Sequence, residues 1–180
     1  IVGRDTKKAL LPFLLGGFAK KIRSGDTFYR LAKHYGTTIA AIAAANPALN
    51  PEKLVPGTEI YIPYGFDLVP SDVRWTSKLN ELVLEGLKLR YPFIGTETYG
   101  KSVMGRPLRA VSIGAGSAEA FFNASHHANE GITTPLVLKF AENYLKAYIN
   151  GSSIFGRDAR ELFAKTRLFI ATLVNPDGVD

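Results

Sequence analysis

The chain has 180 residues, with 46% hydrophobic residues, 21% charged residues and no cysteine, an ordinary composition for a globular protein. The lack of cysteine excludes a disulfide-stapled scaffold, a cysteine-based zinc finger and an iron–sulfur protein. No run of about 18 apolar residues occurs, so no membrane-spanning helix is predicted. The length allows one domain, or a small domain joined to part of a larger one.

The net charge of +6 is concentrated at the amino end. Residues 1–33 carry eight basic and two acidic side chains, whereas residues 34–180 carry fourteen of each. A nucleic-acid-binding surface normally interleaves basic and aromatic residues across a folded element, and this chain instead has a basic end on a neutral body. The charge therefore predicts no nucleic-acid partner and favours an anionic polymer or surface.

Residues 1–17 allow two interpretations. Basic residues precede an apolar stretch from Ala9 to Gly17, which together with small residues beside Phe18 is typical of a weak export signal. Pro12 interrupts that apolar stretch, which favours a disordered or extraneous tail. Both a tail and a signal remnant stay open.

Residues 18–63 predict a small β-α-α-β module. A strand at 20–23 is followed by a helix whose apolar residues lie at i, i+3, i+4 and i+7 and which Gly36 ends. A second helix starts after Thr38 and stops at Asn46-Pro47, and residues 59–62 form the second strand. The inner faces of the two helices are predicted to carry Phe28, Leu31, Ala32 and Tyr35, and then Ile39, Ile42 and Ala43.

This module resembles a LysM domain over its whole length. The resemblance rests on Arg23-Ser-Gly-Asp-Thr27, Tyr35-Gly-Thr-Thr38, Ala45-Asn-Pro47 and Leu54-Val-Pro-Gly57 in order and spacing. It implies binding to glycans that contain N-acetylglucosamine, such as peptidoglycan or chitin, in a groove between two loops. The residues it implicates are Gly25, Asp26, Thr27, Phe28, Asn46, Pro47, Ala48 and Leu49. For Asp26 and Thr27, capping of the following helix is an alternative role that we favour.

Residues 64–73 are predicted to be a linker, and residues 74–180 begin a second domain of α/β class. A helix at 75–91, hairpin strands at 97–100 and 108–113, a buried strand at 120–124 and a helix at about 130–149 are predicted in turn. A further helix at 157–165 precedes an apolar strand at 168–174, which belongs in the middle of a sheet. The strand–helix–strand order from 120 to 174 predicts a parallel pair.

The chemistry-bearing residues follow the strand at 120–124. His127 and Glu130 are three residues apart at a predicted helix start, which would place them on one face and close enough to share a metal ion. Imidazole nitrogen and carboxylate oxygen together suit Zn²⁺. The pattern alone is weak, and a surface histidine near a capping glutamate is the alternative. The carboxyl end of a strand, where open α/β sheets bind ligands, strengthens the metal interpretation.

The second domain resembles the zinc carboxypeptidase family of the carboxypeptidase A kind. The resemblance rests on Gly100-Lys-Ser-Val-Met-Gly-Arg-Pro107, on His127-Ala-Asn-Glu130 with Thr133-Thr-Pro135, and on Asn175-Pro-Asp-Gly178. It implies that His127 and Glu130 are two of three zinc ligands, that Asn129 contacts substrate, and that Asn175–Gly178 is a structural turn. Asn129 replaces an arginine of the family pattern, and Gly131 stands where the related peptidoglycan peptidases usually have tryptophan.

The resemblance also implies residues that this chain does not contain. The third ligand and the general-base glutamate lie beyond the Asn-Pro-Asp-Gly turn in the family, and the remaining histidines, His34 and His126, match neither role. We therefore expect a truncated peptidase domain, inactive alone. The implied intact protein is a wall-associated or extracellular zinc peptidase that cleaves γ-D-glutamyl–diamino acid bonds in peptidoglycan stems. The alternatives are a non-catalytic glycan-binding protein and a fragment whose sheet edge seeks a partner chain.

Overall fold

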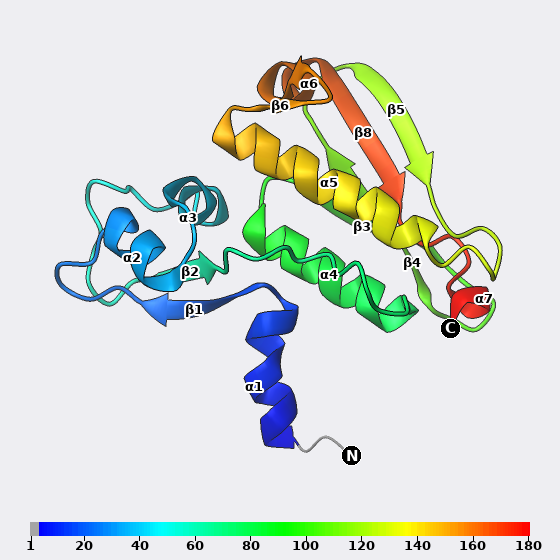
Figure 1. The fold of residues 1–180 in the computed structure, drawn as a ribbon, viewed down its shortest axis with the longest axis horizontal. Helices are drawn as coiled ribbons and strands as arrows, with labels where there is room; N and C mark the ends of the chain where they lie inside the picture. Colours follow the sequence, from blue (N-terminus) through cyan, green and yellow to red (C-terminus); the bar gives the residue numbers. More distant parts are fainter. Residues whose placement is uncertain (1–3) are drawn as a thin grey trace. The chain divides into compact units, whose positions relative to one another are not determined.

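The computed structural model describes residues 4–180, so the first three residues of the predicted tail lie outside the described part. The chain divides into two compact units (Figure 1). The first contains the residues up to Leu68 together with Glu85–Pro92, and the second contains Val69–Leu84 and Phe93–Asp180. No helix within residues 4–180 has both the length and the apolar character that crossing a bilayer requires.

The first unit begins with helix α1 (Arg4–Leu14), in the segment for which the sequence predicted a tail or a signal remnant. Pro12 lies inside the helix rather than ending it. Near the end of α1, the ring of Phe13 stacks on Tyr64 with ring centroids 5.2 Å apart. The part of this segment that the structure describes is therefore ordered against its own unit, and its biological origin stays a prediction.

The β-α-α-β order predicted for the small module is confirmed. Strand β1 (Gly17–Lys21) pairs antiparallel with β2 (Glu59–Pro63), in a register that places Ala19 opposite Tyr61. Helices α2 (Phe28–Tyr35) and α3 (Ile39–Ala45) lie between the strands in sequence. Both helices have threonine N-caps, and Gly36 ends α2 in the left-handed conformation at φ 63°. Strand β1 starts three residues earlier than expected.

The core of this module is small and mostly aliphatic, with one phenylalanine. It consists of Ile22, Phe28, Leu31, Ala32, Ile42, Ile60 and Ile62, all at most 6% exposed. Only Ile42 of the three residues predicted for the inner face of α3 is buried, because Ile39 and Ala43 are exposed. The prediction for those two residues was wrong: a seven-residue helix turns a single residue fully into so small a core.

The second unit is a four-stranded mixed sheet with helices, and the division between the units falls within α4 (Ser77–Arg90). The sheet order is β3-β4-β8-β5, formed by β3 (Gly95–Lys101), β4 (Pro107–Ile113), β5 (Ala118–Asn123) and β8 (Thr166–Ala171). The other elements are α5 (Thr133–Asn150), β6 (Ser153–Ile154), β7 (Arg157–Asp158), α6 (Ala159–Lys165) and α7 (Pro176–Val179).

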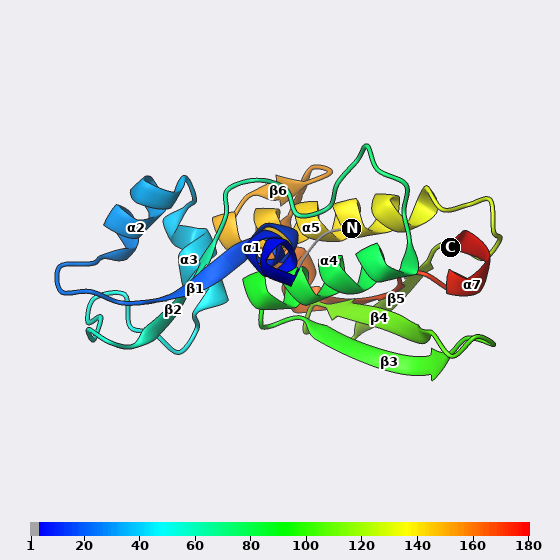
Figure 2. The same cartoon turned by 90° about the horizontal axis from the view of Figure 1, so that it is seen from below.

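The predicted parallel pair is confirmed, since β5 and β8 run parallel and α5 connects them along the chain. Strand β8 lies inside the sheet, with Ile170 fully buried, and α5 packs on one face of the sheet (Figure 2). The prediction that 120–124 is a buried strand was wrong for β5, whose six residues are all exposed. Strand β5 is the last strand in the sheet order, so apolar residues such as Phe121 lack a second neighbouring strand within the described part.

Candidate metal centre

The predicted zinc ligands lie in the loop that joins β5 to α5. Helix α5 begins at Thr133 rather than at Glu130, so residues 127–132 form turns instead of the first helical turn. The loop starts at the carboxyl end of β5, beside the carboxyl end of β8. His127 and Glu130 are therefore presented from a strand end, as predicted, although not from a helix.

A buried serine holds the base of this loop. Ser125 is 1% exposed and has φ 53°, a left-handed conformation that is uncommon outside glycine. Its N–H donates to Thr133 Oγ1 at 2.7 Å, and its hydroxyl donates to the carbonyl of Glu130 at 3.1 Å. The hydroxyl also shares a 2.8 Å hydrogen bond with Thr134, which donates to the carbonyl of Thr172 in turn. This network connects the loop to α5 and to the chain after β8.

His127 and Glu130 contact each other directly. Nδ1 of His127 lies 2.6 Å from Oε1 of Glu130, and the His127 N–H donates to Oε2 at 3.2 Å. The two side chains are 76% and 39% exposed, respectively. Hydrogen bonds from the His127 side chain, and then from its backbone, hold the pKa of Glu130 below its ordinary value. Glu130 is thus an ionised carboxylate at neutral pH, as a metal ligand must be.

These two donors fit a zinc ion as part of a larger set. Two ligand atoms on one tetrahedral zinc lie about 3.3 Å apart, so Nδ1 and Oε1 would have to separate by well under 1 Å to receive the ion between them. The pair is exposed, which leaves room for further ligands. Within residues 4–180 no group of three histidine, cysteine, aspartate or glutamate side chains is placed to hold a metal.

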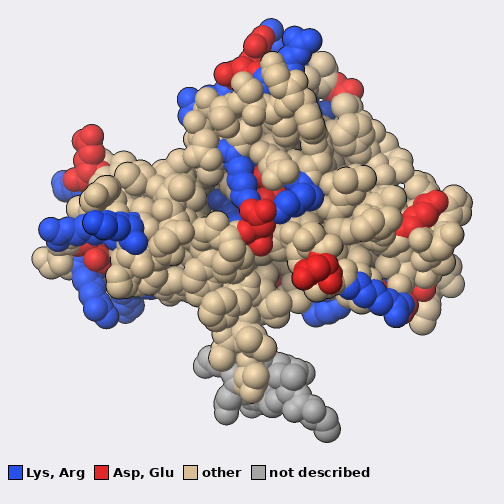
Figure 3. Space-filling view, in the orientation of Figure 1, with Lys and Arg blue, Asp and Glu red and all other residues tan. Residues whose placement is uncertain are grey.

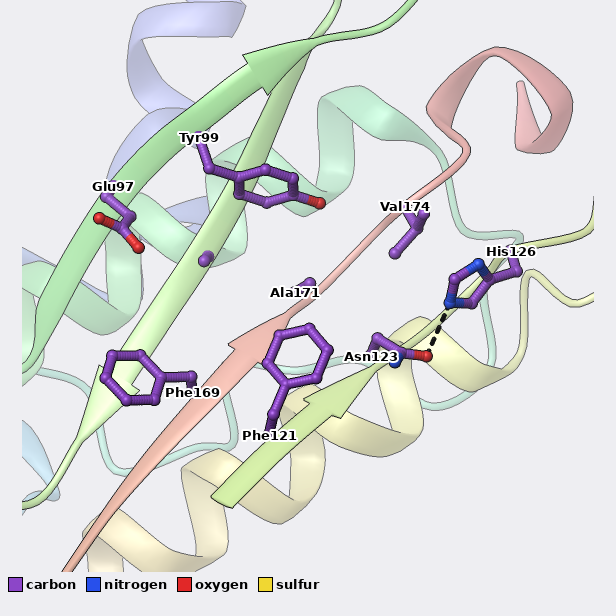
Figure 4. Close-up of a pocket in the computed structure, with 9 residues that line it drawn as sticks. Glu97, Tyr99, Phe121, Asn123, His126, Phe169, Ala171 and Val174 are labelled. Carbon is purple, nitrogen blue, oxygen red and sulfur yellow. Dashed lines mark hydrogen bonds between the residues drawn. The ribbon is translucent and has the colours of Figure 1, made fainter. Parts of the chain in front are cut away.

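The neighbouring His126 turns to a different surface. Its Nε2 lies 2.8 Å from Oδ1 of Asn123, and both residues line a pocket of about 420 Å³ on the sheet (Figure 4). Phe121 and Tyr99 lie in the same pocket. His126 is therefore apart from the His127–Glu130 pair, as its position next to His127 suggested. Asn129, predicted to contact substrate, is exposed in the turn between the two ligands.

Asn175 is the N-cap of helix α7, and it hydrogen-bonds to the loop between β5 and α5, which we call the metal loop (residues 124–132). The side chain of Asn175 donates to the carbonyl of His126 at 3.1 Å, and its backbone N–H donates to the carbonyl of Ser125 at 2.9 Å. Asp177 accepts hydrogen bonds from Ser102 Oγ, Met104 N–H and Arg106 Nη1. The turn predicted to be structural thus joins the β3–β4 hairpin to the loop. The motif signalled this turn, whereas nothing local signalled the role of Ser125.

Five of the eight residues implicated in glycan binding have side chains with structural contacts. Thr27 Oγ1 accepts from the Arg30 N–H at 3.1 Å and caps α2, and Phe28 is 4% exposed. Asn46 clamps α3 to β2, because its amide donates to the carbonyls of Ile42 and Tyr61 and accepts from the Tyr61 N–H. The capping role favoured for Asp26 was wrong: its carboxylate accepts from Lys20 and from the Arg23 N–H instead of from the first turn of α2. Gly25, Pro47 and Ala48 are exposed, and Leu49 packs partly on the core.

The second unit has a mixed β-sheet with helices and carries this loop at a strand end, and a LysM-like module precedes it in the chain. Comparison with known families confirms both parts. The zinc carboxypeptidase family matches residues 81–180, and the LysM domain family matches residues 21–63. The chain belongs to the zinc carboxypeptidase family and also carries a LysM domain.

Two curated bacterial relatives match about half of the chain. Gamma-D-glutamyl-L-diamino acid endopeptidase 1 of Lysinibacillus sphaericus is 39% identical over 97 residues, which are 54% of this chain and 24% of the relative. The uncharacterized protein YqgT of Bacillus subtilis (strain 168) is 41% identical over 92 residues, 50% of this chain and 24% of the relative. The chain spans about a quarter of the length of these relatives.

A solved structure shares the fold of the second unit. Bovine thrombin-activatable fibrinolysis inhibitor, solved in complex with tick carboxypeptidase inhibitor, has a TM-score of 0.51 and 20% identity. The match covers 60% of this chain and 33% of that one. At this identity the likeness shows the fold alone.

Proposed function

We propose that this chain is part of a zinc-dependent peptidase that hydrolyses the peptide stems of peptidoglycan at the bond between γ-D-glutamate and a diamino acid. The observation that carries the proposal is the 2.6 Å contact of His127 with Glu130, at the end of a strand in a zinc carboxypeptidase domain. The bond is inferred from the relative whose name specifies it. The LysM module on the same chain favours a wall polymer over other peptide substrates.

In this proposal His127, through Nδ1, and Glu130 hold the zinc ion together with a ligand from outside the 180 residues. Bound zinc supplies a Lewis acid that polarises the scissile carbonyl. Ser125 and Asn175 keep the loop in place, and Asn129, exposed between the two ligands, faces the acyl side of the substrate. A general base is needed as well, so we expect the 180 residues alone to be inactive.

In this proposal the LysM module raises the local concentration of substrate and takes no part in the hydrolysis itself. Binding of glycan strands by the loops at Gly25–Phe28 and Asn46–Leu49 would keep the peptidase among the stems that the glycan carries, which raises their effective concentration. Neutral sugars suit loops that offer backbone groups and small apolar side chains. This role places the protein at the cell wall or outside the cell.

A second function is a glycan-binding protein with an inactive peptidase remnant. The observation that favours it is the LysM module, whose binding of glycans needs no catalytic group from the second unit. In that case the protein would bind insoluble peptidoglycan and cleave nothing.

The experiment is hydrolysis of purified muropeptides by protein expressed from the complete reading frame that contains this chain. We expect release of the diamino-acid fragment, loss of that release in His127→Ala, and retention in His126→Ala as the matched control. Equal hydrolysis by wild type and His127→Ala would contradict the peptidase proposal. Binding without hydrolysis in all three proteins would support the glycan-binding alternative.

A further inference from the structure

Three of the eight basic residues within residues 1–33 line a pocket in the LysM module that glycan binding does not explain. Lys and Arg side chains cluster over the turn between β1 and α2 (Figure 3). A hollow of about 330 Å³ lies there, on the β1–α2 side of the module. It is lined by Lys20, Arg23, Asp26, Arg30, Leu31, His34 and Tyr35.

The contacts in this pocket hold its cations in place. Lys20 Nζ forms a 3.0 Å ion pair with Asp26 and lies 5.8 Å from the ring centroid of Tyr35. Arg30 Nη1 donates to the carbonyl of Gly25 at 3.0 Å, which fixes one edge of its guanidinium. Because these contacts already restrict the side chains, less side-chain entropy is lost when a ligand binds.

The pocket carries an excess of positive charge. Asp26 accepts from Lys20 and from the Arg23 N–H, so its carboxylate is already engaged. Arg23 and Arg30 are exposed, and no acidic side chain in the described part of the chain forms an ion pair with either. Two guanidinium groups therefore remain available at the rim.

We propose that this pocket binds an oxyanion, a carboxylate or a phosphate, carried on a polymer of the cell wall. Two arginines offer the paired N–H donors that match oxyanions, whereas the charge of Lys20 is balanced by Asp26. The pocket shares only Asp26 with the residues implicated in glycan binding, and it borders the same Gly25–Phe28 loop. An acidic substituent of a bound glycan, or a separate anionic polymer, could reach it. The assignment to a wall polymer rests on the proposed function, whereas anion binding itself does not.

The test is an NMR titration of the 180-residue chain with inorganic phosphate at constant ionic strength. We expect saturable shifts in the amides of residues 20–35, and about tenfold weaker binding in the double variant Arg23→Gln/Arg30→Gln, because charge-assisted hydrogen bonds are lost. The matched control, Lys33→Gln/Lys53→Gln, removes the same charge from exposed positions outside the pocket and should bind within about twofold of wild type. Equal loss in both double variants, or no saturable shifts, would overturn the proposal.

Two further arms separate this site from the glycan site and separate the sources of the anion. Triacetylchitotriose should bind the single variant Arg23→Gln, which leaves the Arg30–Gly25 hydrogen bond in place, as tightly as wild type, so failure of glycan binding and failure of anion binding are distinguishable. Muropeptides with free carboxylates and poly(glycerol phosphate) are then compared as competitors of phosphate. Competition by either one identifies the source and supports the proposal, and competition by neither contradicts the assignment to a wall polymer. Thermal melts check that each variant is folded.

Discussion

At the scale of single residues, the conformation of the metal loop depends on Ser125, which has an unusual backbone conformation. Ser125 combines φ 53° with almost complete burial, and its hydroxyl bonds to the carbonyl of Glu130 and to Thr134. A hydrogen bond of this kind contributes about 0.5–1.5 kcal/mol, because its partners keep other bonds: Thr133 Oγ1 donates to the carbonyl of Glu130, and Thr134 donates to the carbonyl of Thr172. Ser125 therefore stabilises the loop and fixes where His127 and Glu130 lie.

Two substitutions of Ser125 distinguish the contribution of its hydroxyl to stability from the cost of its backbone conformation. Ser125→Ala removes the hydroxyl and keeps the unfavourable φ, so it should lower the free energy of unfolding of the second unit by about 0.5–1.5 kcal/mol. Ser125→Gly also removes the hydroxyl but tolerates this φ, so it should be destabilised less than Ser125→Ala. Urea denaturation gives both values, with the exposed Ser117→Ala as control. A Ser125→Ala variant as stable as Ser117→Ala would contradict the role of the network.

At the scale of elements, cap residues made the small helices predictable. Gly36, Thr38 and Asn46 are boundaries of α2 and α3 in both the sequence and the structure, because each cap acts within four residues of its own position. The sequence left the N-cap of α2 open between Asp26 and Thr27, and in the structure it is Thr27. The burial of β5 was not predictable in this way, since an apolar run does not show whether a strand lies inside a sheet or at its end.

The candidate site shows the same division between local and long-range information. The three-residue spacing of His127 and Glu130 suffices to bring them into contact. The bonds from Asn175 to the loop, and from Thr134 to the carbonyl of Thr172, join residues 38 to 50 positions apart and carry no periodic signal. The start of α5 at Thr133 follows from those bonds, because they hold residues 125–132 in turns.

Removing the threonine caps distinguishes the two roles proposed for Thr27, capping of α2 and contact with the sugar. Thr27→Ala should lower the stability of the LysM module by about 1 kcal/mol, and Thr38→Ala, which removes the equivalent cap from α3, should cost a similar amount. Thermal melts followed by circular dichroism measure both. If Thr27 acts only as a cap, triacetylchitotriose should bind the two variants equally at a temperature where both are folded. A selective loss of affinity in Thr27→Ala would show that Thr27 contacts the sugar.

Helix α7 should make the second unit sensitive to acid. The pKa of Asp177 lies below its ordinary value of 3.8, chiefly because the Met104 N–H donates to it, with Arg106 and Ser102 adding to the effect. A carboxylate with a lowered pKa in the folded state contributes stability above its unfolded pKa and loses that contribution as pH falls through the folded value. Asp177→Asn should thus be less stable than wild type at pH 7, with the difference shrinking below about pH 4.

Urea midpoints between pH 2 and pH 7 measure this difference, and the exposed Asp72→Asn is the matched control because it makes the same change in charge. A difference between wild type and Asp177→Asn that stays constant across this range would contradict the prediction.

At the scale of the whole molecule, the chain joins two functions with different physical demands. The unit that contains the LysM module has eleven basic and six acidic side chains, a net charge of +5. The zinc carboxypeptidase unit has eleven basic and ten acidic side chains, a net charge of +1, and its chemistry lies in one loop. Sequence patterns predicted both units, because each contains motifs whose residues lie within a few positions of one another. The proposed peptidase activity depends most on whether His127 and Glu130 bind zinc.

The most direct test is a zinc titration of the 180-residue chain, with the nitrogens of its three histidine rings followed by NMR. We predict weak, saturable binding in which Nδ1 of His127 responds and the rings of His34 and His126 do not. Glu130→Gln should weaken that response by about tenfold or more, because a carboxylate ligand is replaced by an amide. Zinc binding in which His127 does not respond, or in which Glu130→Gln has no effect, would contradict the account.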